Sequence, residues 1–152
     1  MEKQEYYSLL QSQLTTLLEG EHDPIANMAN MSALLYHTLP DVSWVGFYRY
    51  VNGELILGPF QGKPACMHIP YGMGVCGLCL KEQRLFRVDD VINFPNHIAC
   101  DSASRSEIVI PLWRDLQIAA VLDIDAPILQ RFDETDEIEL SKLTAILEQS
   151  CK

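Results

Sequence analysis

The stretch SWVGFYRYVNGELILGPF, residues 43–60, decides the fold, because its hydrophobic pattern has the period of two that β-strands require. The pair Asn52-Gly53 interrupts this pattern and is a strong signal for a two-residue hairpin turn. We therefore predict two antiparallel strands joined at that turn. One face of the first strand carries Trp44, Gly46, Tyr48 and Tyr50. That face is either one aromatic side of a core or an aromatic wall over a ligand pocket.

Two helices are predicted before this hairpin. The apolar residues of the first recur at helical spacing until Gly20: Tyr6, Leu10, Leu14 and Leu17. Asp23 and Pro24 are typical of the cap and first residue of a second helix. The apolar face of that helix comprises Ile25, Met28, Met31 and Leu35. We expect both faces to pack in a core or an interface.

The rest of the chain completes an α+β pattern. Residues 61–104 are rich in loops, with a short helix near 76–82 and a short strand, LFRV. Residues 106–126 form a second predicted hairpin, joined at Asp115-Leu116. A final helix, capped by Asp133 or Thr135, carries Leu140, Leu143 and Leu147 on one side. This order predicts a mainly antiparallel sheet with helices on one face.

Length and charge limit the classes of protein and partner. The 152 residues fit a single domain, 1–152. The formal net charge of −10 disfavours nucleic acid and anionic membrane surfaces as partners. No run of about 18 apolar residues predicts a membrane span, and the N-terminus lacks the pattern of a secretory signal. We expect a cytoplasmic protein that binds a small cationic or zwitterionic ligand, or a protein partner.

The chain has five cysteines, more than packing alone requires: Cys66, Cys76, Cys79, Cys100 and Cys151. In a cytoplasmic protein such clusters indicate redox chemistry or a metal. The Cys66 and Cys100 segments are polar loops where a reactive thiol can be exposed, and Cys76 lies near a helix start. Alternatively, the single Cys76-x-x-Cys79 motif is half of a structural zinc site completed by Cys66, Cys100, His68 or His97. Cys79 is expected to be a packing residue.

Three carboxylates in the second hairpin form another candidate site. Asp123 and Asp125 share one face of their strand, and Glu107 joins them if the hairpin connection has an odd number of residues. Such a face could be a solvent-exposed edge. The strands are otherwise strongly apolar, however, and aspartate is costly to bury without a partner. A buried cluster would indicate a cationic ligand, a metal or a carboxyl group that holds its proton.

Four segments together resemble the GAF-type free methionine-(R)-sulfoxide reductases. They are SWVGFYRY (43–50), GKPACMHIPYGMGVCG (62–77), FPNHIACDSASRSEIVIPL (94–112) and AAVLDIDAP (119–127). The resemblance covers nearly the whole chain, and its three cysteine motifs are more specific than a GAF fold alone. It implies a GAF domain, with a central, mostly antiparallel six-stranded sheet and flanking helices. It also implies reduction of the R sulfoxide of free methionine.

The resemblance assigns roles to individual residues. It implies Cys100 as the nucleophile, Cys66 as the resolving cysteine and Cys76 as an accessory thiol. Glu107, Asp123 and Asp125 would hold the substrate, with Trp44 and Tyr48 around its methyl group. Cys79 is an additional thiol relative to the family pattern.

The implied reaction needs no metal or organic cofactor. Cys100 would become a sulfenic acid and then a disulfide, and a thioredoxin-type dithiol would restore the thiols. We expect Glu107 to supply the proton, and Asp123 and Asp125 to pair with the substrate ammonium. The alternative is a non-catalytic GAF sensor of a small ligand. The first and last helices could pair between chains, so we expect a homodimer.

Overall fold

The computed structural model describes residues 1–98, 100 and 102–152 and contains one six-stranded sheet. Its strands are β1 (Trp44–Val51), β2 (Glu54–Gln61), β3 (His68–Pro70), β4 (Phe86–Val88), β5 (Ser106–Arg114) and β6 (Gln117–Ala126). They lie in the order β3-β2-β1-β6-β5-β4, and every neighbouring pair is antiparallel. Both predicted hairpins are therefore confirmed. The short edge strand β3 was not predicted.

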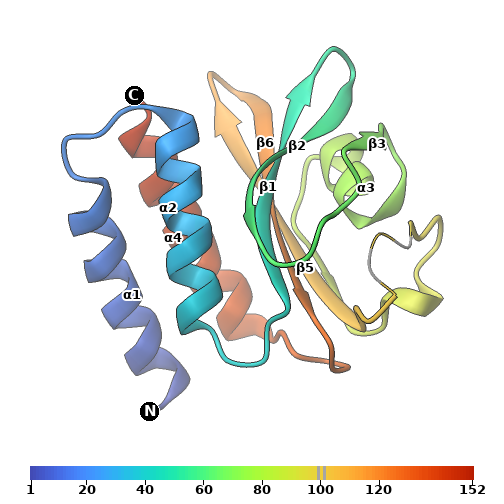
Figure 1. Cartoon of the computed structure of the whole chain (residues 1–152), viewed down its shortest axis with the longest axis horizontal. Coiled ribbons are helices and arrows are strands. Elements are labelled where there is room, and N and C mark those ends of the chain that lie inside the picture. Colours follow the sequence, from blue (N-terminus) through green and yellow to red (C-terminus); the bar gives the residue numbers. More distant parts are fainter. Residues whose placement is uncertain (99, 101) are drawn as a thin grey trace.

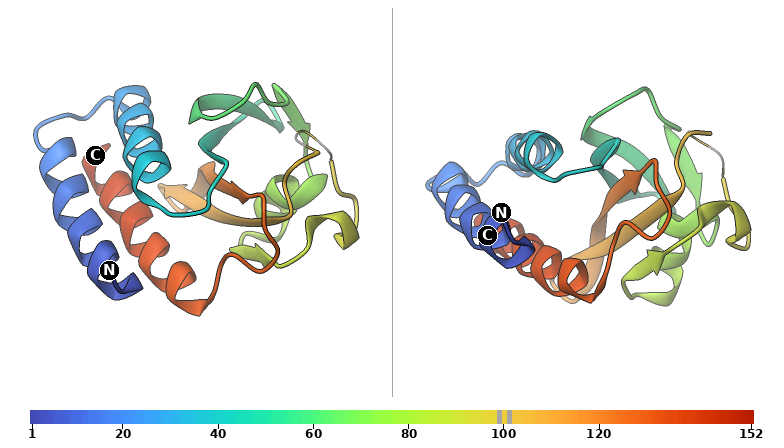
Figure 2. Two further views of the ribbon diagram at one scale, coloured as in Figure 1. Left: turned by 60° about the horizontal axis from the view of Figure 1, so that its bottom comes forward. Right: turned by 90° about the horizontal axis from the view of Figure 1, so that it is seen from below.

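Helices cover both faces of the sheet (Figures 1 and 2). On one face lie α1 (Lys3–Leu18), α2 (Pro24–Thr38) and α4 (Glu134–Ser150), with α1 outermost against α2 and α4. The other face carries α3 (Gly74–Glu82) and the loop with the 3₁₀ turn Val91–Asn93. The α+β prediction is confirmed, but the prediction of helices on one face is wrong. Because the sheet is apolar on both faces, each face needs a cover.

Alternation along the strands produces two hydrophobic cores. The side chains that face α1, α2 and α4 include Phe47, Ile108 and Leu122. Their neighbours, including Tyr48, Val109 and Val121, face α3 and the long loop. Asp123 and Asp125 belong to this second face, because they follow Val121 at alternate positions of β6. The strand period thus places polar groups beneath α3.

The helix starts and faces agree with the sequence in most places. The Asp23 side chain accepts a hydrogen bond from the Ala26 N–H, 3.0 Å away, and Asp133 caps α4. In α1, however, Tyr7 and Leu18 are buried instead of Tyr6 and Leu17, and Leu17 is 43% exposed. The Tyr7 hydroxyl donates to Asp136 Oδ1 at 2.6 Å, which sets the rotation of α1 against α4.

A β-bulge sets the register of the second hairpin. Arg114 pairs with Gln117 across a turn of two residues, a connection that by itself would place Glu107 opposite Ile124. The next two pairs are Trp113 with Ile118 and Leu112 with Ala120, so β6 contains one extra residue between them, Ala119. The extra residue shifts the remaining pairs by one, as β-bulges do. Glu107 consequently pairs with Asp125.

No helix in the described part of the chain is both long and apolar enough to cross a membrane.

Candidate active site

The three predicted carboxylates lie together on the face of the sheet beneath α3. Glu107 on β5 is directly opposite Asp125 on β6, and Asp123 is opposite Val109. Asp123 is only 6% exposed, and its Oδ1 atom has no hydrogen-bond partner among the described residues. A buried carboxylate oxygen without a partner is costly, so the cluster indicates a ligand that can donate to it.

An aromatic wall stands beside the carboxylates. Trp44 pairs with Asp125 across β1 and β6, and its ring stacks on Tyr48 and Phe60, with centroids 5.9 and 5.2 Å away. A side chain at Gly46 would collide with Phe60 and with the Trp44 ring, so only glycine permits this packing. The prediction of an aromatic wall over a pocket is supported by this arrangement.

The same wall fixes the loop that carries Cys66. The Trp44 Nε1–H donates to the Lys63 carbonyl at 3.1 Å, and the Tyr48 hydroxyl donates to the Cys66 carbonyl at 3.0 Å. Both hydrogen bonds are made by buried aromatic side chains on a central strand. The position of Cys66 is thereby tied to the rigid sheet.

Cys66 and Cys100 are joined by a disulfide bond, with their Cα atoms 5.5 Å apart. The bond connects two loops separated by 34 residues in the sequence. Cys76 remains a free, buried thiol in the first turn of α3, and its Sγ lies 4.0 Å from Glu107 Oε2. Asp101, part of the HIACD motif, lies outside the described residues.

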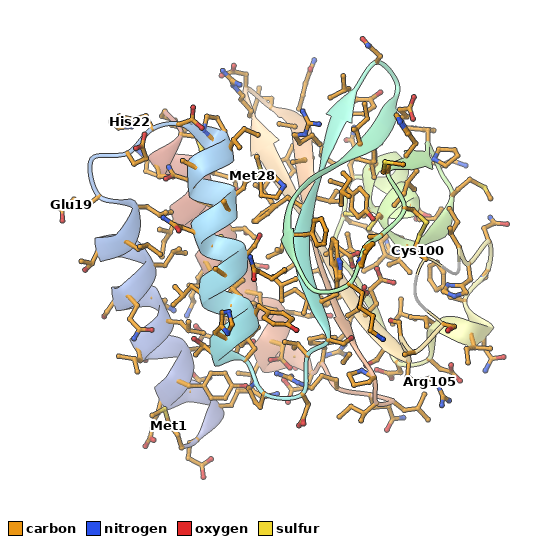
Figure 3. The ribbon with its side chains drawn as sticks, viewed as in Figure 1. Met1, Glu19, His22, Met28, Cys100 and Arg105 are labelled. Atoms are coloured by element: carbon orange, nitrogen blue, oxygen red, sulfur yellow. A yellow bond between two sulfur atoms is a disulfide. The ribbon has the colours of Figure 1, made fainter. Side chains whose placement is uncertain are left out.

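A cavity of about 50 Å³ connects these groups. Its lining includes seven of the eight residues in the predicted site: Trp44, Tyr48, Cys76, Cys100, Glu107, Asp123 and Asp125. The eighth, Cys66, is bonded to Cys100 through the disulfide. Figure 3 shows Cys100 in the region beside α3, on the face of the sheet opposite α1 and α2.

Other cavity residues had no predicted role. Lys63, Ile98 and Ser104 line it, as does the N-terminal turn of α3, which begins at Gly74. Gly74 has a φ of 64° and donates its N–H to the Asn96 carbonyl, which ties the Cys100 loop to α3. The glycine-rich run 72–77 was the available sequence signal, since such runs permit close backbone approach.

Burial and mutual repulsion alter the acidity of these groups. Burial, followed by the charge of Asp123, raises the pKa of the Glu107 carboxyl well above its ordinary value. Burial and the charge of Asp125 likewise raise the pKa of Asp123. The Cys76 thiol also has a strongly raised pKa, first from burial and then from the carboxylates. The charges that raise these three pKa values all come from neighbouring acids, so a cation that binds among Glu107, Asp123 and Cys76 reduces their mutual repulsion.

Among the described residues, the group of possible metal ligands around Cys76 contains neither Cys79 nor a histidine, so the structural zinc site considered from the sequence is not assembled. Cys66 and Cys100 are bonded to each other, so neither offers a free thiolate to Cys76-x-x-Cys79. Cys79 is completely buried, as expected of a packing residue, and burial raises its thiol pKa to about 12. His68 is on the surface, where its Nδ1 lies 2.7 Å from Glu54 Oε1.

Comparisons with known proteins identify the family. No family model matches the chain. The free methionine-R-sulfoxide reductase of Escherichia coli is 48% identical over 149 residues, covering 98% of this chain and 90% of its own length. The free methionine-R-sulfoxide reductase of Neisseria meningitidis, solved in complex with its substrate, is 42% identical with a TM-score of 0.96, covering 99% of this chain and 91% of that one.

A solved structure also shows which fold this chain has. A structure described as that of the GAF domain aligns with a TM-score of 0.94 and 38% identity, covering all of this chain and 90% of its own. The six-stranded antiparallel sheet expected from the resemblance is therefore confirmed as a GAF fold. With nearly half its residues identical to the Escherichia coli enzyme over almost its full length, this chain belongs to the free methionine-R-sulfoxide reductase family.

Proposed function

We propose that this protein reduces free methionine-(R)-sulfoxide to methionine. The observation that carries the proposal is the shared cavity. It brings Cys100, disulfide-bonded to Cys66, next to a buried acidic cluster and an aromatic wall. A reductase of this kind needs a nucleophilic thiol, a second thiol, a proton donor and groups that hold the amino acid. The described residues around the cavity offer each of these.

The chemistry begins from the reduced protein. The Cys100 thiolate attacks the sulfoxide sulfur, and the sulfur–oxygen bond breaks as the oxygen is protonated and leaves as water. Water then attacks the Cys100 sulfur, the new sulfur–sulfur bond breaks with its electron pair going to methionine, and Cys100 becomes a sulfenic acid. Methionine is released. The Cys66 thiol then attacks the sulfenic sulfur, water leaves, and the disulfide forms. The Cα separation of 5.5 Å is within the normal range for a disulfide, so the described fold accommodates the oxidised product.

Asp123 and Asp125 are the proposed partners of the substrate ammonium group. They extend from β6 into a cavity whose other ionisable walls include Glu107 and Cys76, both acids. A methionine inside a polypeptide has no ammonium group, so its entry would leave Asp123 without this charge partner. Leaving a buried charge without its partner costs about 3–5 kcal/mol, which favours the free amino acid.

Glu107 is the proposed proton donor. Its carboxyl group is opposite Asp125 on the neighbouring strand, on the same sheet face as Asp123. Carboxylates held this close cannot all ionise at low cost, so one of them retains a proton that can pass to the departing oxygen. Trp44 and Tyr48 would enclose the apolar end of the substrate, since their stacked rings form the adjacent wall.

A thioredoxin-type dithiol is the proposed reductant. Cys66 is partly exposed, in a loop, which allows an external thiolate to approach the disulfide. A cytoplasmic location would keep that reductant in its thiol form. The homodimer remains a prediction, and so does the single-domain assignment of residues 1–152.

The test couples reduced protein to thioredoxin, its reductase and NADPH, and follows NADPH loss with the R and S isomers of free methionine sulfoxide. We expect turnover of the R isomer, its loss in Cys100→Ser, and its retention in the control Cys151→Ser. Cys151 lies on the opposite side of the sheet, against the core under α4. Binding of methionine without turnover by the reduced wild-type protein would overturn the proposal in favour of the GAF sensor.

A further inference from the structure

We propose that the cavity beneath α3 binds a zinc ion through Cys76 Sγ and one carboxylate oxygen each of Glu107 and Asp123. These three atoms lie within 4.8 Å of one another, on two strands and a helix. This ion is a ligand that competes for the cavity, and the sulfoxide chemistry does not require it.

The distances suit a small tetrahedral ion. Zinc–sulfur and zinc–oxygen bonds of about 2.3 and 2.1 Å place tetrahedral ligand atoms roughly 3.5 Å apart. The Sγ of Cys76 and Oε2 of Glu107 are already 4.0 Å apart. Side-chain rotations that move each ligand atom by less than about 1 Å would bring the three atoms to these separations.

A second observation indicates that the cluster is built for a ligand. Asp123 Oδ1 is buried in the cavity wall and lacks a hydrogen-bond partner among the described residues. Asp123 as a whole is only 6% exposed, so water provides little compensation. An incoming cation coordinates this oxygen directly.

The donor set selects the class of metal. Magnesium and calcium prefer sites made entirely of oxygen atoms, whereas a thiolate combined with carboxylates favours zinc and its softer relatives. The three ionised ligands would carry three negative charges, which a divalent cation largely neutralises. With three protein ligands, the fourth position remains open to water.

The oxidised protein isolates this site from the catalytic thiols. With Cys66 and Cys100 held in their disulfide, the free cysteines are Cys76, Cys79 and Cys151. Cys79 provides a matched control, because it is buried in the same helix but does not belong to the three-residue group. The site must therefore survive in the oxidised Cys79→Ser variant and disappear in Cys76→Ser.

The experiment titrates oxidised protein with zinc against a chromophoric chelator, and with cobalt to observe a sulfur-to-metal charge-transfer band. We expect one zinc ion per chain. Loss of a group that only hydrogen-bonds to a metal ligand weakens metal affinity by about 10–100-fold, so removal of the ligand itself in Cys76→Ser should weaken it by more than about 100-fold. Asp123→Asn should weaken it as well, and Cys79→Ser should leave it unchanged.

Three results would overturn the site: no stoichiometric zinc binding by wild type, full affinity in Cys76→Ser, or cobalt binding without the sulfur band. The readout is metal affinity, so it is independent of turnover. A protein that fails as a reductase can still bind zinc here, and an active reductase can fail to bind it.

Discussion

Asp123→Asn tests how this protein would recognise a free amino acid. The change keeps the size of the side chain and removes the negative charge from a position that is 6% exposed and opposite Val109 on β5. If Asp123 pairs with the substrate ammonium, the variant loses a buried charge partner. Neither the fold nor the thiol pair is altered.

The magnitude follows from the burial of Asp123. Removing one partner of a buried ion pair costs about 3–5 kcal/mol, which corresponds to roughly 150- to 5000-fold in kcat/KM. Asp125 is on the same face of β6 and retains part of the attraction, so the lower limit applies. We expect a loss of about 150-fold for free methionine-(R)-sulfoxide.

The assay compares the free substrate with N-acetylmethionine-(R)-sulfoxide, which has no ammonium group. Wild type should prefer the free substrate strongly. In Asp123→Asn the preference should collapse, because only the free substrate loses an interaction. Asp115→Asn makes the same chemical change at the tip of the β5–β6 hairpin and should preserve the preference.

Two outcomes would refute this reasoning. An equal loss of kcat/KM for both substrates would indicate that Asp123 acts in the chemical step. An unchanged kcat/KM for the free substrate would show that Asp123 does not recognise the ammonium group. Thermal unfolding serves as the control for misfolding of the variant. Because Asn relieves repulsion within a buried acidic cluster, the unfolding midpoint of the variant should equal or exceed that of wild type.

Further predictions concern stability. Leu143→Ala, at a completely buried position under α4, should lower the free energy of unfolding by about 2–5 kcal/mol, whereas Leu116→Ala, at a position 95% exposed, should change it by less than about 0.5 kcal/mol. Denaturant unfolding measures both, and similar losses would contradict the assigned core. Asp133→Ala should cost about 1 kcal/mol by removing the cap of α4. Burial alone would raise the pKa of Asp133, but the hydrogen bond from the Asp136 N–H and the Lys3 ammonium hold it below its ordinary value. This stabilisation is therefore complete above about pH 4 and is lost as pH falls through the lowered pKa. Unfolding measured from pH 7 to 2 should show the difference in unfolding free energy between wild type and Asp133→Ala decrease at the acidic end. A difference that stays constant would show that the charge of Asp133 does not contribute to stability.

Local signals in the sequence were sufficient for most of the fold. The period of two and the Asn52-Gly53 turn predicted the first hairpin, because a two-residue turn fixes the pairing of its own strands. The Asp23 cap depends only on neighbouring backbone groups, so it too was predictable. The rotation of α1 was not predictable, because the hydrogen bond between Tyr7 and Asp136 connects residues far apart in the chain.

The site shows the same division. The sequence by itself determined which residues could matter, because three cysteine motifs and strand-borne aspartates are unusual enough to indicate a family and its chemistry. From the sequence, the pairing of Glu107 with Asp125 depended on the unknown number of residues in the hairpin connection. The structure resolves this condition through the bulge at Ala119, which shifts the register by one residue and moves Glu107 onto the acidic face.

Only the tertiary structure decided which groups share the cavity. The Cys66–Cys100 bond crosses 34 residues, and the hydrogen bonds of Trp44 and Tyr48 hold the Cys66 loop above the sheet. Likewise, nothing in the sequence indicated that Asp123 Oδ1 would be buried with no hydrogen-bond partner among the described residues. The physical reason is that residue types and strand period are local properties of the chain. Burial and proximity instead arise when the sheet, α3 and the loops enclose a common space.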